Sequence, residues 1–159
     1  MQLFPRSGPS SQEIPNRAAY YRELVERIER IPGVESASYS HMGPVYMTDY
    51  TEAASITSSS EPAVQAAKEW IGPRFFHLAG MRLLAGRELD WRDDENARKV
   101  AVISESLRQR LFPDGNAVGR MVDFGKDKGL QVVGVVSNAS LWSSQPSADG
   151  GVRLANAIP

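Results

Sequence analysis

The sequence predicts a mixed α+β domain, and three patterns along the chain indicate it. Apolar residues recur at helical spacing near the N-terminus, a short apolar run ending in a serine predicts a buried strand that leads into a helix, and two alternating runs near residue 130 predict a β-hairpin. At 159 residues, the chain has the length of one domain, or of one domain with two lobes. A chain of this size buries about 70% of its unfolded surface, so it needs no metal or disulfide to hold a core.

The first elements are a predicted strand over residues 2–5 and a Gly/Pro/Ser-rich loop over residues 6–12. Pro15 suits the first turn of a helix. Apolar side chains recur in that helix at spacings of four, four and three, so they are expected to form one stripe that faces a core: Tyr20, Leu24, Ile28 and Ile31. Pro32-Gly33 ends the helix, and the alternation over residues 34–40 predicts a strand.

The middle of the chain is polar and Ser/Thr-rich over residues 43–61, which predicts a loop with one or two weak strands. Residues 63–72 predict the next strand. Pro73 then opens a short helix that closes at Gly80, where a left-handed backbone favours glycine. Residues 81–86 are expected to be extended.

A charged loop over residues 91–99 precedes a short buried strand over residues 100–104. Ser104 is expected to cap the helix that follows, with Leu107 and Leu111 on one side, and Pro113 stops that helix.

The last predicted element is a β-hairpin, formed by residues 120–124 and 130–137 around a turn of four or five residues within 125–129. Residues 139–159 contain a linker-like Ser/Pro/Gly segment, and we expect this tail to be poorly structured.

The bulk composition argues against several classes of function. The formal net charge is −1, so the chain lacks the basic surface of a nucleic-acid-binding protein. It has no cysteine, which excludes disulfides, thiolate zinc sites and cysteine nucleophiles. No run reaches the roughly 18 apolar residues of a membrane-spanning helix, and no segment has the pattern of a signal peptide.

An acidic cluster is the one candidate for a metal site: Glu88, Asp90, Asp93, Asp94 and Glu95. Its order lacks the alternating ligands, central glycine and terminal glutamate of a calcium-binding EF-hand loop. Basic residues lie among these acids and can neutralise them: Arg87, Arg92, Arg98 and Lys99. We therefore expect a solvated loop and no bound metal.

The search for a catalytic centre points to none. The sequence contains two histidines, His41 and His77, but no Gly-x-Ser-x-Gly motif that would supply a nucleophilic serine. Ser104 is better explained as a helix cap. The spaced glycines of residues 115–125 follow a helix and precede a strand, which is the reverse of a phosphate-binding loop. The sequence predicts no catalytic residue, no cofactor-binding residue and no metal ligand.

Residues 70–89 are predicted to have a structural role and no catalytic one. Gly72-Pro73 would turn the chain from a strand into a helix, and three apolar side chains of that helix would fill the core: Phe75, Phe76 and Leu78. Gly80 and Gly86 would release the chain at bends, and Arg87 would brace its acidic neighbours.

Four motifs occur along residues 15–138 in a fixed order: an Ile-Pro-Gly-Val-Glu helix end, a Pro-x-Phe-Phe helix with a Gly-Arg bend, a Phe-Pro-x-x-Asn-x-x-Gly-Arg turn, and a Val-Gly-Val-Val strand. The residues that match are Ile31, Pro32, Gly33, Val34, Glu35, Pro73, Phe75, Phe76, Gly80, Gly86, Arg87, Phe112, Pro113, Asn116, Gly119, Arg120, Val133, Gly134, Val135 and Val136. Together they resemble the MacB-like periplasmic core domain of FtsX-like ABC transporter permeases, in particular the acidobacterial-type permeases that carry this unit twice. The tail departs from the family pattern, because it lacks the Pro/Tyr-rich segment that usually follows the last motif.

The resemblance implies a two-lobed α+β fold, with a βαβ lobe like the porter domains of efflux pumps and a smaller mixed α/β lobe that carries the hairpin. It implies one core domain over residues 1–138, with its lobes divided near 43–61 and 80–100, on the periplasmic side of a bacterial inner membrane. There it would be a non-enzymatic module that couples transmembrane motion to substrate export or to an adaptor protein.

The partners that the resemblance implies are the transmembrane helices of the same permease chain, an ABC ATPase that acts indirectly, a periplasmic adaptor, and a second copy in the full transporter. Two alternatives stay open at the level of sequence. One is a free-standing periplasmic binding module for a peptide, a lipid or an antibiotic, which would need an apolar pocket between the lobes. The other is a hydrolase, which would need a histidine within hydrogen-bond reach of a hydroxyl.

Overall fold

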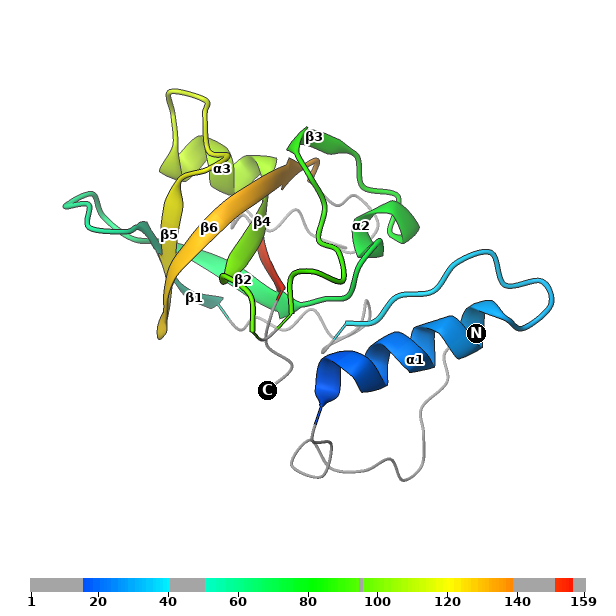
Figure 1. The fold of residues 1–159 in the computed structure, drawn as a ribbon. Helices are drawn as coiled ribbons and strands as arrows, with labels where there is room; N and C mark the ends of the chain where they lie inside the picture. Colours follow the sequence, from blue (N-terminus) through cyan, green and yellow to red (C-terminus); the bar gives the residue numbers. More distant parts are fainter. Residues whose placement is uncertain (1–15, 41–50, 95, 139–150, 156–159) are drawn as a thin grey trace.

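A computed structural model describes residues 16–40, 51–94 and 96–138, together with the backbone of residues 151–155 (Figure 1). The elements are, in chain order, α1 (Arg17–Glu29), β1 (Thr51–Ile56), β2 (Val64–Trp70), α2 (Phe75–Leu78), β3 (Leu83–Gly86), β4 (Val100–Ser104), α3 (Glu105–Leu111), β5 (Met121–Phe124), β6 (Asp127–Val136) and β7 (Gly151–Ala155). The predicted mixed α+β class is confirmed. None of the described helices has the length and apolar character that crossing a bilayer requires.

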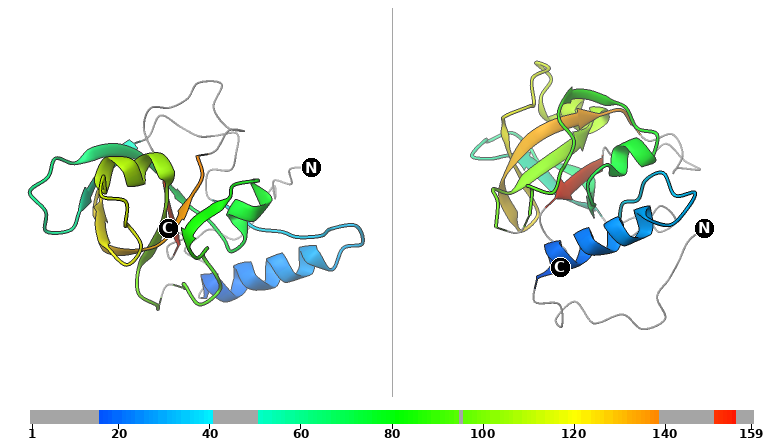
Figure 2. Two further views of the ribbon diagram at one scale, coloured as in Figure 1. Left: turned by 90° about the horizontal axis from the view of Figure 1, so that it is seen from above. Right: turned by 45° about the vertical axis from the view of Figure 1, so that its right-hand side comes forward.

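The seven described strands form a single sheet in the order β3-β6-β4-β7-β2-β1-β5, and β6 also pairs with β5. This extra pairing closes six of the strands into a ring, and β3 is added at β6 (Figures 1 and 2). Because β6 is ten residues long, its first part pairs with β5, as at Val122–Leu130, and its last part pairs with β4 and β3. We call the described residues from 51 onward the sheet body.

The sheet body has two groups of core residues, and β4 contributes to both. Ala101 and Ile103 belong to the larger group, with Leu107 and Leu111 of α3. Val100 and Val102 belong to the smaller group, which α2 covers with Phe75, Phe76 and neighbouring residues. Burial on both faces explains why the β4 sequence reads as an unbroken apolar run without alternation.

The helix α1 forms where the sequence predicts it, but the predicted stripe does not face a core. Asn16 caps the helix by accepting a hydrogen bond from the Ala19 N–H at 2.9 Å. Tyr20, Leu24 and Ile31 are 38%, 39% and 52% exposed, whereas Val25 is 4% exposed and is the one buried residue of α1. The expectation that the stripe packs inward is therefore wrong.

In all three views α1 lies beside the sheet body, near α2 and away from α3 (Figures 1 and 2). One narrow face of the helix carries its contacts, at successive spacings of four: Tyr21 meets the Tyr39 ring, Val25 is buried, and Glu29 pairs with Arg74 of the body. We call residues 16–37, which comprise α1 and the chain that returns from it, the arm.

Several local predictions are confirmed. One strand, β1, forms within the polar segment, and Gly80 closes α2 at a φ of +67°. Ser104 caps α3, since its hydroxyl accepts a hydrogen bond from the Leu107 N–H at 3.3 Å. The hairpin forms from β5 and β6, although its turn is shorter than expected. Phe124 pairs with Asp127, so the loop is only Gly125-Lys126, with Gly125 at a φ of +53°.

Three other expectations are wrong. Residues 34–40 form no strand and make a single bridge, from Ser40 to Ile71. Leu78 is 46% exposed, because α2 is one turn long and buries only the side that carries its phenylalanines. Within the tail, residues 151–155 form β7, which fills the sheet between β4 and β2. The predicted strand at residues 2–5 lies outside the described residues.

Candidate functional site

The chain leaves β3 at a corner where two glycines of different family motifs lie face to face. Gly86 pairs with Gly134 of β6 and has a φ of +73°. A Cβ atom added to Gly86 would lie far inside van der Waals contact with the Val133 carbonyl oxygen, and one added to Gly134 would strike the Arg87 carbonyl oxygen in the same way. The Arg87 N–H donates to the Val133 carbonyl at 2.9 Å. Only glycine lets the two backbones approach this closely.

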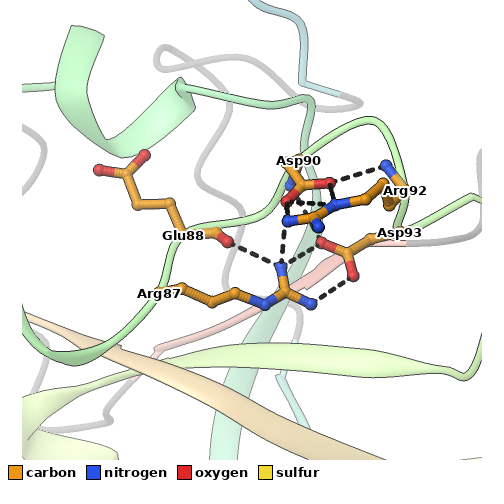
Figure 3. A network of polar contacts seen from close by, with 5 residues as sticks. All are labelled: Arg87, Glu88, Asp90, Arg92 and Asp93. Atoms are coloured by element: carbon orange, nitrogen blue, oxygen red, sulfur yellow. Dashed lines mark hydrogen bonds and ion pairs between the residues drawn. The ribbon is translucent and has the colours of Figure 1, made fainter.

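Arg87 then fixes the loop that follows the corner (Figure 3). Its guanidinium binds the Asp93 carboxylate at two points, Nη1 to Oδ2 and Nη2 to Oδ1, both at 2.7 Å. The Asp93 side chain is only 5% exposed, and its Oδ2 also accepts the Asp90 N–H at 2.9 Å. Parallel bonds between a guanidinium and a carboxylate are strong and directional. The prediction that Arg87 braces its acidic neighbours is confirmed.

A second arginine closes the same loop from outside. Arg92 donates from Nη2 to Asp90 Oδ2 at 2.7 Å and from Nε to Asp90 Oδ1 at 3.0 Å. These side-chain bonds, helped by the Arg92 backbone N–H and by the charges of both arginines, lower the pKa of Asp90 to about 2 despite its partial burial. Hydrogen bonds to Asp93 raise the pKa of Arg87.

Two acids of the cluster, Asp90 and Asp93, are therefore paired with arginines. Within the described part of the chain, no group of three or more His, Asp or Glu side chains is arranged to hold a metal ion. Lys99, which the sequence places among these acids, reaches Asp127 of β6 at 3.7 Å. Glu95 lies outside the described residues.

The braced loop presents Trp91 to α1. The Trp91 ring lies 6.3 Å from the Tyr39 ring, which in turn lies 4.7 Å from the Tyr21 ring, centroid to centroid. The Arg22 guanidinium is 5.8 Å from the centre of the Trp91 ring, a cation–π contact. A continuous line of rings thus joins the helix to the loop after the Gly86 corner.

A second contact joins the far end of α1 to α2. The Glu29 carboxylate accepts the Ala37 N–H at 3.1 Å and forms an ion pair with Arg74. Arg74 stands at the start of α2 with a φ of +60°, a left-handed conformation that is unusual for a residue with a side chain. Ion pairs with half-exposed partners contribute about 0–1 kcal/mol. Burial of one valine contributes about 1.5–3 kcal/mol, so α1 is held by a small sum of contacts.

The sheet body contains a buried ionic cluster that the sequence reasoning missed. Lys68 of β2 has a side chain only 2% exposed, and its Nζ lies 2.9 Å from Asp127 Oδ2 and 3.2 Å from Glu52 Oε2. The ammonium also lies 4.6 Å from the Trp70 ring centre. Although burial lowers the pKa of Lys68, its hydrogen bonds to Asp127 and Glu52 and their charges raise it on balance. One signal in the sequence could have indicated its burial: Lys68 is two residues from Ala66, so both side chains lie on the same, apolar face of the strand.

The groups considered for catalysis are not brought together. His77 is exposed on α2, and the Ser104 hydroxyl accepts the Leu107 N–H and contacts Ser106. His41 lies outside the described residues. In the described residues, Arg87, Gly86 and Gly134 hold a loop against the closed sheet, and that loop meets α1.

Three of the four family motifs meet at β6. Gly86 contacts Gly134, and the Phe-Pro-x-x-Asn-x-x-Gly-Arg turn pairs with β6 through the Gly119 N–H, which donates to the Val132 carbonyl at 2.7 Å. Within that turn the Arg120 guanidinium lies 5.3 Å from the Phe112 ring centre. The first motif is elsewhere, at the end of α1.

The model of the family described as "MacB-like periplasmic core domain" matches residues 1–155. Among curated proteins, the macrolide export ATP-binding/permease protein MacB of Campylobacter jejuni is 28% identical over 77% of this chain and 20% of its own length. The protein of the same description from Chromobacterium violaceum is 36% identical over 46% of this chain and 11% of its own length. The chain thus spans a fifth or less of these relatives.

Solved structures with the same fold include the periplasmic region of MacB from Actinobacillus actinomycetemcomitans, with a TM-score of 0.58 and 20% identity. The match covers 85% of this chain and 54% of that one. The extracellular domain of the noncanonic ABC-type transporter YknZ from Gram-positive bacteria also has a TM-score of 0.58, with 15% identity, over 92% of this chain and 68% of that one.

Proposed function

Because the chain belongs to the family of MacB-like periplasmic core domains, we propose that it is a non-enzymatic, extracytoplasmic domain of an ABC transporter permease. In this proposal the domain lies on the periplasmic side of a bacterial inner membrane and contacts transmembrane helices of its own longer chain. It passes their motion to an exported substrate or to a periplasmic adaptor protein, and an ABC ATPase drives that motion indirectly from the cytoplasmic side.

The observation that carries this proposal is the corner at Gly86 and Gly134. There β3, β6 and the loop after β3 form one closely packed unit, and Arg87 extends that unit to Asp93 through two hydrogen bonds of 2.7 Å. A domain that transmits displacement needs a body that does not deform, and close-packed interiors are poorly compressible and transmit strain. The residues that resemble the family pattern supply this stiffness.

The polar residues of the loop support the same reading. Asp90 and Asp93 each accept side-chain hydrogen bonds at both carboxylate oxygens from one arginine, Arg92 and Arg87 respectively. Carboxylates engaged in this way hold a backbone in place and are poorly suited to exchange protons with a substrate. The role proposed for them is structural.

The location is tested by cysteine labelling, because this chain has no cysteine of its own. Lys128→Cys would be placed on the hairpin, where the lysine side chain is 65% exposed, in the product of the complete open reading frame with any other cysteines replaced by serine. A membrane-impermeant maleimide should label it in intact spheroplasts as fully as in lysed ones. Val132→Cys, at a fully buried position, is the control and should label only after denaturation. Labelling of Lys128→Cys only after lysis would contradict the proposal.

The coupling is tested by distance measurements in the assembled transporter. Spin labels at Lys128→Cys and Glu61→Cys, both exposed on the sheet body, should keep one mutual distance when ATP is added. A label pair that joins position 128 to a transmembrane helix should change its distance with ATP. An unchanged second distance would contradict a coupling role and would leave the location result standing.

A further inference from the structure

Among the described residues, the arm meets the rest of the chain at an aromatic contact and at an ion pair, and both are partly exposed to solvent. Near the start of α1, Tyr21 and Arg22 contact the Tyr39 and Trp91 rings. At its end, Glu29 pairs with Arg74, whose side chain is 50% exposed. Between these two contacts Val25 is the one buried residue of the helix. Regions with few buried apolar contacts open at lower free energy than the core of the same protein.

The arm has a defined joint with the body. The Gly72 N–H donates to the Tyr39 carbonyl at 2.8 Å, and Ser40 bridges to Ile71, so the chain becomes fixed to the body at residues 39–40. Just before that point the Ser38 hydroxyl is buried and has no hydrogen-bond partner among the described residues. Buried polar groups are usually hydrogen-bonded, so the hydrogen-bonding capacity of this segment is incompletely satisfied at Ser38.

The arm is also a unit in itself. Glu29 at the end of α1 accepts the Ala37 N–H, which ties the returning chain to the helix. The turn between them contains Gly33 at a φ of +87°, and beyond its two chain neighbours no described atom lies within 4 Å of the position a Cβ would take. The helix and its return segment can therefore move together without breaking their mutual contact.

We propose that the arm is releasable: α1 and its return segment leave the sheet body as one unit while the closed sheet stays folded. Its use as the part of the domain that shifts during transport rests on the proposed function, but its release is a property of this chain alone. Trp91 is the contact that sets how firmly the arm is held.

Arg87 is a positioning residue in this device. Among the described residues its side-chain hydrogen bonds go to Glu88 and Asp93 of its own loop. Its two-point bond to Asp93, together with the Asp90 N–H bonded to the same carboxylate, fixes the turn that carries Trp91. The Gly86 corner thereby connects β6 to the helix through the loop that carries Trp91. A weaker Arg87–Asp93 contact should loosen the arm and leave the strands unaffected.

Hydrogen exchange followed by mass spectrometry on the 159-residue chain tests the proposal. In the unmodified chain, amides of α1 should exchange at least about 100-fold faster than amides of β4 and β6. Trp91→Ala should speed α1 exchange by about tenfold more and change the strands less than about twofold. Trp91→Phe, which keeps a ring, should restore most of the protection. Arg87→Lys, which keeps the charge and loses the fork, should speed α1 exchange by about threefold.

Two further variants keep the test decisive. Tyr21→Ala removes the ring on the helix side of the contact and should act as Trp91→Ala does, even if the loop variant fails to fold. Lys128→Ala removes an exposed ion pair on the hairpin and should leave α1 exchange unchanged. The proposal is overturned if α1 and β4 amides of the unmodified chain exchange at one rate, or if Tyr21→Ala leaves α1 exchange unchanged. Neither result bears on the labelling test of location.

Discussion

The strand β4 and the helix α1 carry the two clearest apolar patterns of the chain and are treated in opposite ways by the fold. Every residue of β4 is buried, because α2 covers one face and α3 with the closed ring covers the other. Of the apolar stripe predicted for α1, Tyr20, Leu24 and Ile31 are exposed, and the one buried residue of the helix is Val25, which lies outside the stripe. Periodicity therefore predicts the kind of element, and the packing of its neighbours decides which face is covered.

The difference also separates two mechanical roles. Strands of the closed sheet hold one another on both edges, and glycine contacts such as Gly86–Gly134 leave no room for adjustment. The arm is attached by rings and an exposed ion pair that can break and re-form. The predictions below test this contrast between a stiff body and a releasable arm, from the largest effect to the smallest.

The largest expected effect is at the corner of the sheet body. Gly86→Ala combines a left-handed backbone with a clash against the Val133 carbonyl, so it should lower the free energy of unfolding by about 4 kcal/mol. Urea denaturation followed by circular dichroism measures the loss. The matched control is Gly33→Ala in the arm, which has a similar positive φ but open space around it and should cost about 1 kcal/mol. Equal losses at the two glycines would contradict the contrast.

The two apolar patterns are compared by truncating one side chain in each. Ile103→Ala in β4 removes a fully buried side chain and should lower the free energy of unfolding by about 3 kcal/mol. Leu24→Ala in α1 removes a side chain that is 39% exposed and should change it by less than about 0.5 kcal/mol. The same urea titrations give both values. A loss at Leu24 close to that at Ile103 would mean that the stripe is packed in solution.

Substitution of the buried Lys68 tests whether its ionic cluster with Glu52 and Asp127 stabilises the closed ring of strands. Lys68→Met leaves Glu52 and Asp127 beside each other without the buried ammonium, while the more exposed Lys99 stays 3.7 Å from Asp127, so it should cost about 2–3 kcal/mol at neutral pH. Because the folded pKa of Lys68 is raised, its stabilisation is complete below about pH 10.5 and is lost as the pH rises through the higher folded pKa. Stability of the unmodified chain should therefore fall more steeply above pH 10.5 than that of Lys68→Met. Parallel pH profiles would count against the ionic cluster.

The smallest expected effect is at Asp90 in the loop that carries Trp91. Its pKa is about 2 in the folded chain, below the ordinary 3.8, so its contribution is complete above pH 3.8 and is lost as the pH falls toward 2. The Asp90 side chain is 36% exposed, and screening by solvent keeps the effect under about 1 kcal/mol. Asp90→Asn should flatten this part of the acid profile. An unchanged profile would show that the contact with Arg92 adds no stability.

Much of the fold was predictable because local signals specify local structure. Ser104 followed by an amphipathic run predicts a capped helix, and Gly80 and Gly86 predict bends at a positive φ. Long-range pairing was not predictable in this way. Strand β7 comes from a segment without a strong strand pattern and is recruited by β2 and β4, whose edges it fills. Residues 34–40 alternate as a strand does but find only one bridging partner.

Of the contacts in the candidate site, only the ion pair of Arg87 was predictable from the sequence. Arg87 beside a run of acids indicates an ion pair, and the structure forms it with Asp93. That Trp91 meets Tyr39 could not be read from the sequence, because the two residues are far apart in the chain and no local pattern pairs them. Likewise, nothing in the sequence near Glu29 indicates Arg74 as its partner, since a left-handed turn before α2 brings the two together.

The most direct test of the account is native-state hydrogen exchange of this chain at increasing urea concentrations below the unfolding transition. If the arm is released from a folded body, α1 amides should show a lower opening free energy than β4 amides, with little dependence on urea, because local release exposes little surface. If α1 and β4 amides instead share one opening free energy and one urea dependence, the arm and the body unfold as a single unit and the account is wrong.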